Sequence, residues 1–332
     1  MKSERVVWTA VSTAEVQEFE IGSPGPGEVL VEVAYSLVSP GTERGWLTGV
    51  EPLPFRTGSP FPMYPGYAVS GVVLEVGDGV SHLAAGDRVV GMAPHARHGL
   101  GRADDFTRVP EGVPLDEATF FHLGFVSMNG VRRARVELGE RVVVLGLGLV
   151  GLIAVQAARW QGALPLIGVD VVPERLELAR RAGADLVIDG RDAAALAGAL
   201  EAVGGPQVVV EATAAKEPLR SALAMVRPMG RVVLLSSKAG EMEADLFGGV
   251  HMKGTTLIGA QTMRRPRVDS QPGLWTWQDD ATAYLEMIRY GRIDVRPFIT
   301  HRVPGERAPE VYELVAAGDP ALIGGLFAWN EG

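Results

Sequence analysis

A glycine-rich motif in the middle of the chain has the residues that a dinucleotide-binding loop needs. The strand-like run RVVVLG leads into Gly146-Leu-Gly148-Leu-Val-Gly151, and the helical pattern LVGLIAVQAARWQGA follows. In such a loop Gly146 permits the tight turn, Gly148 lets the backbone approach a pyrophosphate, and Gly151 lets helix and strand pack closely. The N–H groups of the first helical turn, including those of Leu149 and Val150, would face the phosphates. The alternative is a tight strand-to-helix connection that binds nothing.

An acidic residue in the expected place supports nucleotide binding. The next strand-like run, LPLIGVD, ends in Asp170, whose carboxylate can accept hydrogen bonds from an adenosine ribose. Its negative charge would repel a 2′-phosphate, so the sequence predicts NAD rather than NADP as cofactor. Arg175 follows in PERLELARR, where it would bridge the ribose, lie under the adenine, or equally be a solvated helix residue.

A second stretch, VSPGTERG at residues 38–45, places a hydroxyl, a carboxylate and a guanidinium side by side at Thr42, Glu43 and Arg44. A hydroxyl both donates and accepts hydrogen bonds, so such a cluster could take part in proton transfer. Pro40 and Gly41 would end the preceding strand whatever the function. The stretch is therefore either a reactive cluster or only a turn.

Composition restricts the class of protein. A chain of 332 residues with 47% apolar residues predicts two domains with two cores. The net charge of −9, dispersed along the chain, leaves no basic stripe, so we expect a small-molecule substrate and no nucleic-acid partner. No stretch approaches the roughly 18 to 20 apolar residues of a membrane span, and no secretory leader is expected. The absence of cysteine excludes disulfides and thiolate sites and fits the cytoplasm.

The elements that must position these residues fall into two patterns. Up to about residue 110, short alternating runs broken by glycine and proline predict a mostly antiparallel β domain. From Asp116, a plausible N-cap, DEATFFHLGFVSMNGVRRARV reads as one helix. Six apolar runs then alternate with helical stretches and predict a doubly wound α/β domain with a parallel sheet: RVVVLG, LPLIGVD, DLVID, QVVVEA, RVVLLSS and TTLIGA. In WTWQDD, Thr276 and Asp279 are spaced as a capping box, which predicts a helix start rather than acid chemistry. The remaining tail is expected to rejoin the first domain.

Over nearly its whole length the chain resembles the medium-chain dehydrogenase/reductase superfamily, the group of alcohol dehydrogenases and quinone reductases. The resemblance lies in PGEVLVEVAYSLVSPGTE, YPGYAVSGVVLEVGDGV, GDRVVG, GERVVVLGLGLVGLIAVQAA, VDVVPERLELARRAGAD and HMKGTTLIGA. It implies a GroES-like catalytic domain from residues 1–122 and 266–332, a Rossmann NAD-binding domain from residues 123–265, and a cleft where nicotinamide meets substrate. In this superfamily the edges matching TTLIGA pair between subunits, which implies a homodimer or homotetramer.

The same resemblance implies that no zinc is bound. The places of the zinc ligands in zinc-dependent members hold Pro40, Tyr67, Ala68 and approximately Leu123, none of which is a suitable donor. The cysteine-rich lobe of a structural zinc is replaced by MAPHARHGLGRADD, which we interpret as a surface loop.

Two short motifs point to a sub-group. GTER and PGY resemble the sub-group of bacteriochlorophyllide dehydrogenase and related sugar or cyclitol oxidoreductases, although Ala68 departs from the glutamate expected after PGY.

By resemblance, the cleft receives Thr42, Glu43, Tyr67 and Ser127. Thr42 matches a hydroxyl that relays the substrate proton, and Glu43 would act as a base or anchor Arg44. Tyr67 would donate a proton to a carbonyl oxygen, or only fill the volume of the missing zinc. His122 is a further catalytic candidate, with a packed histidine as the alternative.

The remaining cofactor contacts also come from the resemblance. Ser127 would contact the nicotinamide, and Ala212 and Ser236 would complete the cofactor site.

The leading hypothesis is a zinc-independent NAD(H)-dependent oxidoreductase that acts on a secondary alcohol or ketone, with a polyol, sugar or cyclitol as substrate. One alternative is a quinone or enoyl reductase, which in this superfamily usually prefers NADPH and is therefore disfavoured by Asp170. The other is a catalytically silent NAD(H)-binding redox sensor, which would have no need of Thr42, Glu43 and Tyr67.

Overall fold

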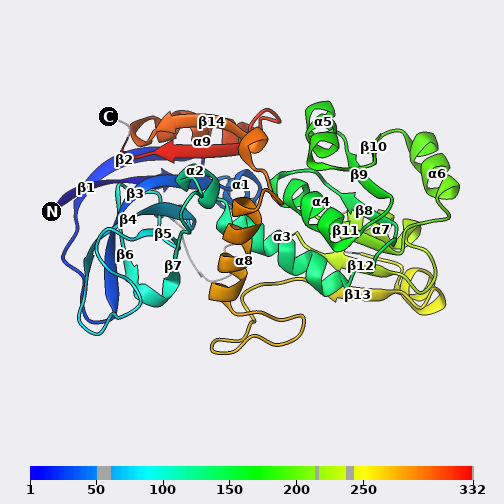
Figure 1. Ribbon diagram of the computed structural model, residues 1–332. Coiled ribbons are helices and arrows are strands. Elements are labelled where there is room, and N and C mark those ends of the chain that lie inside the picture. Colours follow the sequence, from blue (N-terminus) through cyan, green and yellow to red (C-terminus); the bar gives the residue numbers. More distant parts are fainter. Residues whose placement is uncertain (51–60, 214–216, 237–242, 331–332) are drawn as a thin grey trace. The chain divides into compact units, whose positions relative to one another are not determined.

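The structure of this protein is a computed structural model that describes residues 1–50, 61–213, 217–236 and 243–330 (Figure 1). The chain divides into two units. Unit 1 contains Met1–His122 and Ala281–Gly332, and unit 2 contains Leu123–Asp280. The second division was expected at 265/266, whereas the structure assigns residues 266–280 to unit 2.

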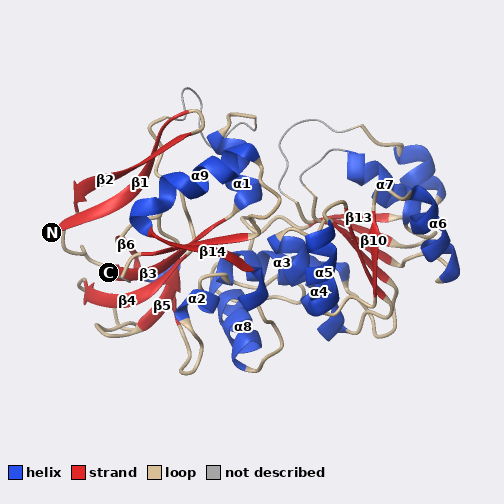
Figure 2. Cartoon of the chain, turned by 90° about the horizontal axis from the view of Figure 1, so that it is seen from above, coloured by secondary structure: helices blue, strands red, loops and turns tan. Residues whose placement is uncertain are grey.

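Unit 2 is built on a parallel sheet whose strands have the order β10-β9-β8-β11-β12-β13. The strands are β8 (Val142–Leu145), β9 (Leu166–Asp170), β10 (Leu186–Asp189), β11 (Val208–Glu211), β12 (Arg231–Leu234) and β13 (Thr256–Gly259). Each apolar run expected to be a strand forms one of them, which confirms the doubly wound α/β prediction. The central strands β8 and β11 are buried throughout, because helices cover both faces of the sheet (Figure 2). β9 and β10 lie on one side of β8, and β11, β12 and β13 lie on the other, so the strand order reverses at β8.

The helices that belong wholly or mainly to unit 2 are α3 (Phe121–Ala134), α4 (Leu149–Gln161), α5 (Pro173–Ala182), α6 (Ala193–Ala202), α7 (Glu217–Met225) and the π-helical turn η2 (Phe247–Met252). The single helix predicted from Asp116 is in fact two, α2 (Leu115–Ala118) and α3. Asp116 lies in the first turn of α2, whose N-cap is Pro114. The break follows Thr119, whose hydroxyl bonds back to the Leu115 carbonyl and also pairs with Ser70, in competition with regular helix geometry.

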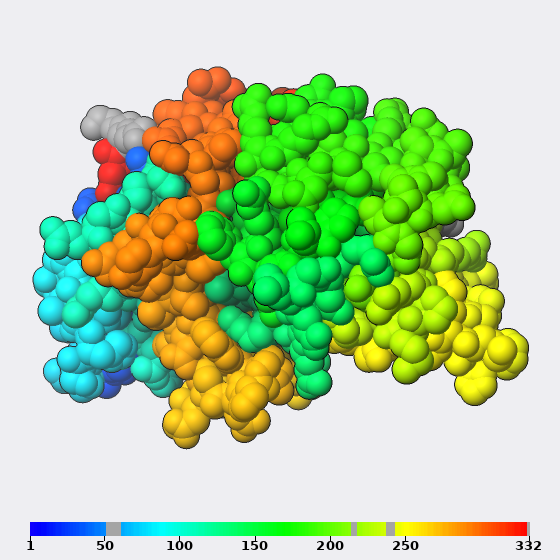
Figure 3. All heavy atoms as spheres, turned by 45° about the vertical axis from the view of Figure 1, so that its right-hand side comes forward, coloured from blue at the N-terminus to red at the C-terminus, as the bar shows by residue number. Residues whose placement is uncertain are grey.

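The edge of the unit 2 sheet is apolar and exposed. β13 is the last strand in the order, and Leu257 is 38% exposed on it. The segment that includes η2 and β13, yellow in Figure 3, lies at the surface. Phe247 and Met252 are 70% and 67% exposed in that segment.

Unit 1 is built on a mostly antiparallel sheet of order β14-β15-β3-β4-β5-β7, with β6 also paired to β3 and a separate β1-β2 pair. Its strands are β1 (Lys2–Ala10), β2 (Thr13–Glu20), β3 (Glu28–Val38), β4 (Val69–Val76), β5 (Arg88–Gly91), β6 (His98–Arg102), β7 (Phe106–Arg108), β14 (Ile299–Pro304) and β15 (Gly324–Ala328). Its helices are α1 (Pro40–Leu47), α2 and α9 (Ala308–Ala317), while α8 (Trp277–Arg289) crosses the division at Asp280. β15 pairs with β3, so the tail does rejoin the first domain (Figure 1).

The stretch VSPGTERG is neither an isolated turn nor a loop. β3 ends at Val38, and α1 begins at Pro40, which fits the first helical position because its fixed φ suits a helix and its missing N–H needs no partner. Thr42 and Glu43 therefore lie in the first turns of a helix, which fixes their positions better than a loop would. No helix in the described ranges is long and apolar enough to cross a membrane.

Candidate active site

The glycine motif forms the loop between β8 and α4, and two of its glycines are required by packing. Gly146 has φ +91°, and a Cβ there would lie 2.7 Å from Thr213 Cγ2. A Cβ on Gly151 would lie 1.9 Å from the Gly146 carbonyl oxygen. Gly148, the N-cap of α4, has nothing within 4 Å of its Cβ position. The loop therefore has free space at the glycine that was expected to let a pyrophosphate approach.

Ser127 is hydrogen-bonded to the first turn of α4, directly after this loop. Its side chain is fully buried, and its hydroxyl lies 2.8 Å from the Leu123 and Val150 carbonyl oxygens. Val150 is in the first turn of α4, so Ser127 joins α3 to the beginning of α4. Both contacts of the Ser127 hydroxyl lie inside unit 2, and the nicotinamide contact expected for it stays a prediction.

Asp170 lies beside the glycine loop at the carboxyl end of β9. Its Oδ2 accepts a hydrogen bond from the Leu147 N–H at 2.6 Å, and Oδ1 accepts from the N–H groups of Val171 and Val172 at 2.7 and 3.0 Å. The Arg175 guanidinium lies 4.0 Å from Oδ2. The carboxylate is thus held at the place where a ribose would meet the loop, with Arg175 next to it.

Ala212 and Ser236 follow the neighbouring strands β11 and β12 at the same edge of the sheet. The Ala212 N–H donates to the Leu145 carbonyl at 2.8 Å, next to the glycine turn. The Ser236 hydroxyl donates to Glu211 Oε2 at 2.7 Å. Glu211 is 3% exposed and its other oxygen accepts from the Thr213 N–H at 2.9 Å. This buried carboxylate was missed in the sequence because QVVVEA reads simply as an apolar strand.

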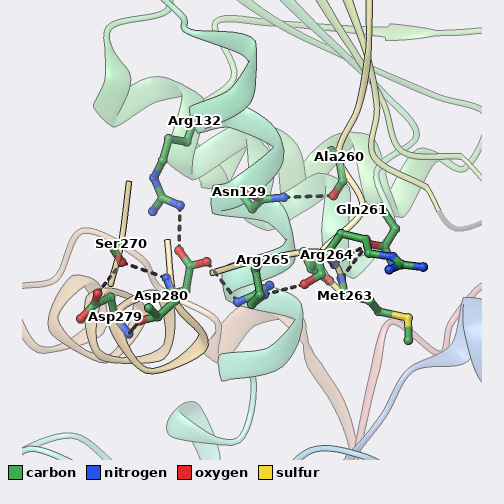
Figure 4. Close-up of polar contacts among 12 residues, drawn as sticks. Asn129, Arg132, Ala260, Gln261, Met263, Arg264, Arg265, Ser270, Asp279 and Asp280 are labelled. Atoms are coloured by element: carbon green, nitrogen blue, oxygen red, sulfur yellow. Dashed lines mark hydrogen bonds and ion pairs between the residues drawn. The ribbon is translucent and has the colours of Figure 1, made fainter. Parts of the chain in front are cut away.

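The segment after β13 is fastened to α3 by a buried ion cluster (Figure 4). Asp280 lies between two arginines, 2.7 Å from Arg132 and 3.3 Å from Arg265, and Asn129 donates to the Ala260 carbonyl at 3.0 Å. Burial raises the pKa of Asp280, and the two guanidinium groups oppose that shift. The cluster anchors the helix that carries Ser127.

WTWQDD is confirmed as a helix start, because the Asp279 N–H donates to the Thr276 hydroxyl at the beginning of α8.

In unit 1, Glu43 is fully buried and both its oxygens face donors. Oε1 accepts from the Ser39 N–H at 2.7 Å, and Oε2 accepts from the Tyr312 phenol at 2.6 Å. His95 Nε2 lies 3.4 Å from Oε2. Glu43 was predicted to act as a base or to anchor Arg44. The partners described for its carboxylate are instead the Ser39 N–H, Tyr312 and His95, and its burial leaves it no contact with solvent.

Thr42, Tyr67 and His122 come together close to this carboxylate. The Tyr67 phenol has hydrogen bonds with the side chains of Ser39 and Thr42. The rings of Tyr67 and His122 meet edge to face with centroids 4.8 Å apart. Burial and then the Glu43 charge raise the pKa of Tyr67, while the hydrogen bonds from Ser39 and Thr42 oppose the rise. Tyr67 is therefore a neutral phenol, able to donate a hydrogen bond at neutral pH.

The interpretation of MAPHARHGLGRADD as a surface loop is wrong. His95 is fully buried and His98 is 7% exposed, and each has its Nδ1 next to a serine hydroxyl, Ser36 at 2.8 Å and Ser3 at 2.9 Å. Part of the stretch joins the sheet, because β6, which begins at His98, pairs with β3. His95 is thus a site residue that no pattern in the sequence indicated.

Comparisons with known proteins agree with both units. Residues 25–115 match the alcohol dehydrogenase GroES-like domain, and residues 150–274 match the zinc-binding dehydrogenase family. The chain belongs to the medium-chain dehydrogenase/reductase superfamily. It is accordingly a nicotinamide-dependent oxidoreductase with a GroES-like domain and a Rossmann domain, as expected.

Individual relatives are distant but cover the chain. Sorbitol dehydrogenase of Gallus gallus is 26% identical over 341 residues, 91% of this chain and 90% of the relative. D-guloside 3-dehydrogenase of Shigella flexneri is 26% identical, over 93% and 95% of the two chains. An alcohol dehydrogenase from Escherichia coli CFT073, solved in complex with NADH, has a TM-score of 0.84 with 19% identity over 99% of both chains, which shows the same fold.

The zinc that this superfamily often carries does not fit the residues present. Pro40, Tyr67 and Ala68 offer no sulfur, imidazole or carboxylate donor. Of the imidazole and carboxylate groups around these positions, Glu43 and His95 have their polar atoms taken by hydrogen bonds, and His122, beside Tyr67, adds a single imidazole. Within the described ranges, no three His, Asp or Glu side chains are grouped so that they could hold a metal ion.

The glycine loop gives a paired test of packing against binding. Gly151→Ala should lower the free energy of unfolding by at least about 2 kcal/mol, because its Cβ would collide with the Gly146 carbonyl. Gly148→Ala should leave stability within about 0.5 kcal/mol of wild type, since it meets open space, yet weaken NADH binding. Chemical denaturation and NADH fluorescence titration measure the two effects. Equal NADH affinity in Gly148→Ala and wild type would remove that glycine from the cofactor site.

Proposed function

We propose that this protein is an NAD(H)-dependent, zinc-independent oxidoreductase that interconverts a secondary alcohol and the matching ketone. The observation that carries the proposal is the pair of hydroxyls, Thr42 and Tyr67, which are hydrogen-bonded to each other and lie next to a buried carboxylate. The relatives named for sorbitol and D-guloside support a polyol or sugar as the substrate class.

The residues of unit 1 would supply the proton chemistry of the reaction. Bound NADH would supply the hydride that reduces the carbonyl carbon. In that direction the Tyr67 phenol would donate its proton to the carbonyl oxygen, and the Thr42 hydroxyl, by its hydrogen bond to Tyr67, would stabilise the resulting phenolate until a proton from water replaces the one transferred. In the direction of oxidation the alcohol proton would pass through the same hydroxyls to water. Glu43 stays behind them as a fixed charge and does not exchange protons with the substrate.

The proton chemistry of the hydroxyl pair, Thr42 and Tyr67, can be tested by substitution. Thr42→Val and Tyr67→Phe should each lower kcat by about 10²-fold, the usual scale for a lost proton-transfer group, and leave NADH affinity within about 2-fold. Thr48→Val is the matched control, because Thr48 directly follows α1 and its hydroxyl only bonds to the Arg44 carbonyl. Steady-state kinetics with NAD⁺ and a panel of polyols and sugars measures the effect. A fully active Thr42→Val enzyme would require withdrawal of its catalytic role.

Cofactor preference follows from the charge of Asp170. We expect NADH to bind at least ~10-fold more tightly than NADPH, about 1.4 kcal/mol, because a 2′-phosphate would lie against the carboxylate. Asp170→Asn should reduce the difference in affinity between NADH and NADPH. Asp189→Asn, at the paired position of β10, should leave that difference unchanged. Fluorescence titration with both nucleotides decides this. Equal or tighter NADPH binding by the wild type would instead favour a double-bond reductase.

Zinc independence has a direct test. Purified protein should contain far less than one zinc per chain by elemental analysis, and a chelator should change neither the melting temperature nor kcat. The reason is the absence of suitable donors at Pro40, Tyr67 and Ala68. Stoichiometric zinc that survives dialysis against chelator would contradict the proposal.

The exposed edge at β13 supports the proposal of a homodimer or a dimer of dimers. An apolar edge strand has unpaired backbone groups that a second copy can cover. Multi-angle light scattering at micromolar concentration should give twice or four times the mass of the chain, and a monomer would contradict the proposal.

A further inference from the structure

A series of hydrogen bonds leads from Trp329, which follows β15, through Ser36 and His95 to Glu43. The Trp329 indole Nε1 donates to the Ser36 hydroxyl at 3.0 Å, and Ser36 Oγ lies 2.8 Å from His95 Nδ1. His95 Nε2 lies 3.4 Å from Glu43 Oε2. The side chains of Ser36, Glu43 and His95 are 0% exposed, so this chain is closed to water.

The donors and acceptors around His95 place a hydrogen on its Nε2. Glu43 is an acceptor at both oxygens, because a backbone N–H faces Oε1 and the Tyr312 phenol donates to Oε2. The ring nitrogen that faces Oε2 must therefore carry a hydrogen, which places it on Nε2. An indole N–H only donates, so Ser36 accepts from Trp329 and has its own hydrogen free to donate to His95 Nδ1. A neutral imidazole with hydrogen on Nε2 satisfies every group.

The carboxylate held in this way fixes the beginning of α1. Glu43 Oε1 accepts from the Ser39 N–H while the Glu43 N–H donates to the Ser39 carbonyl at 2.9 Å, so side chain and backbone close the same turn. Thr42 lies inside that turn, and the Tyr67 phenol is bonded to Thr42 and to the Ser39 side chain. A change in the position of the carboxylate would therefore move both hydroxyls.

We propose that His95 is a positioning residue: its Nε2–H tautomer holds the buried Glu43 carboxylate behind the Ser39–Glu43 turn and thereby fixes the hydroxyl pair of Thr42 and Tyr67. This inference rests on the proposed function, because it assigns those hydroxyls to the reaction. His95 itself contacts neither substrate nor cofactor.

Two substitutions separate the donor to Glu43 from the contact with Ser36. His95→Gln places an amide N–H at the position of Nε2, and His95→Asn places its polar atoms only near Nδ1. We expect His95→Asn to lower kcat at least ~10-fold with the KM for NAD⁺ unchanged, while His95→Gln stays within about 3-fold of wild type. His98→Asn is the matched control, since it removes the other buried histidine of the same stretch and should change stability but not kcat.

If His95 only stabilised the fold, the variants would rank differently in kcat. In that case the losses of kcat would follow the losses of melting temperature, and His95→Gln would be as impaired as His95→Asn. That result, an equal loss in His98→Asn, or unchanged kcat in His95→Asn would overturn the inference.

The tautomer and the turn are measurable without any substrate. Long-range ¹H–¹⁵N spectra of the imidazoles, assigned by the signal missing in His95→Gln, should show hydrogen on Nε2 only. Backbone amide signals of Ser39 and Thr42 should move in His95→Asn and stay in place in His95→Gln. Hydrogen on Nδ1, or an unchanged turn in His95→Asn, would overturn the inference even if no variant were active. A wild-type protein that turned over no alcohol or ketone would instead contradict the proposed function.

Discussion

The burial of one carboxylate, that of Glu43, is the constraint on which the structure of unit 1 depends. Removing an ionised carboxylate from water costs several kcal/mol, and the cost is offset only if its oxygens are matched by donors. Here the donors come from distant parts of the sequence: the backbone at Ser39, the phenol of Tyr312 in α9 and the imidazole of His95. The aromatic side chains around them, such as Phe327 at 5.0 Å from the His95 ring, exclude water. Burial first, and then this fixed charge, raise the pKa of Tyr67 and keep its phenol neutral.

In unit 2 the main constraint is the conformation of the glycine loop between β8 and α4. This loop needs space and unpaired N–H groups, and it obtains them from glycines and from the first turn of α4. Buried polar side chains support the loop from behind: Ser127 contacts the turn, and Glu211 joins the ends of β11 and β12 through Ser236. In both units the groups expected to meet a ligand are held by a second set of residues that are buried behind them.

Local patterns in the sequence predicted the fold and the cofactor loop because both depend on neighbours in the chain. Apolar runs identified every strand of the parallel sheet, and glycine spacing with Asp170 identified the loop. The Glu43 cluster could not be predicted in this way, because Ser36, His95, Tyr312 and Trp329 meet only through tertiary pairing. A histidine in a glycine- and alanine-rich stretch reads as solvated, and no local signal shows that His95 is buried. The same limit applies to Ser127, whose role depends on the carbonyl of Val150.

The pairing of β15 with β3 has a consequence for biosynthesis. Trp329 and Ser36, which meet across this pairing, are 293 residues apart in the sequence, so the surroundings of Glu43 are complete only after Trp329 has left the ribosome. Unit 2, by contrast, is one continuous segment and can fold while the last strands are still being synthesised. Until β15 arrives, the nascent unit 1 has a sheet edge open at β3 and a carboxylate still in water. A chain that stops short of β15 would therefore keep a formed glycine loop in unit 2 while the surroundings of Glu43 in unit 1 stay incomplete.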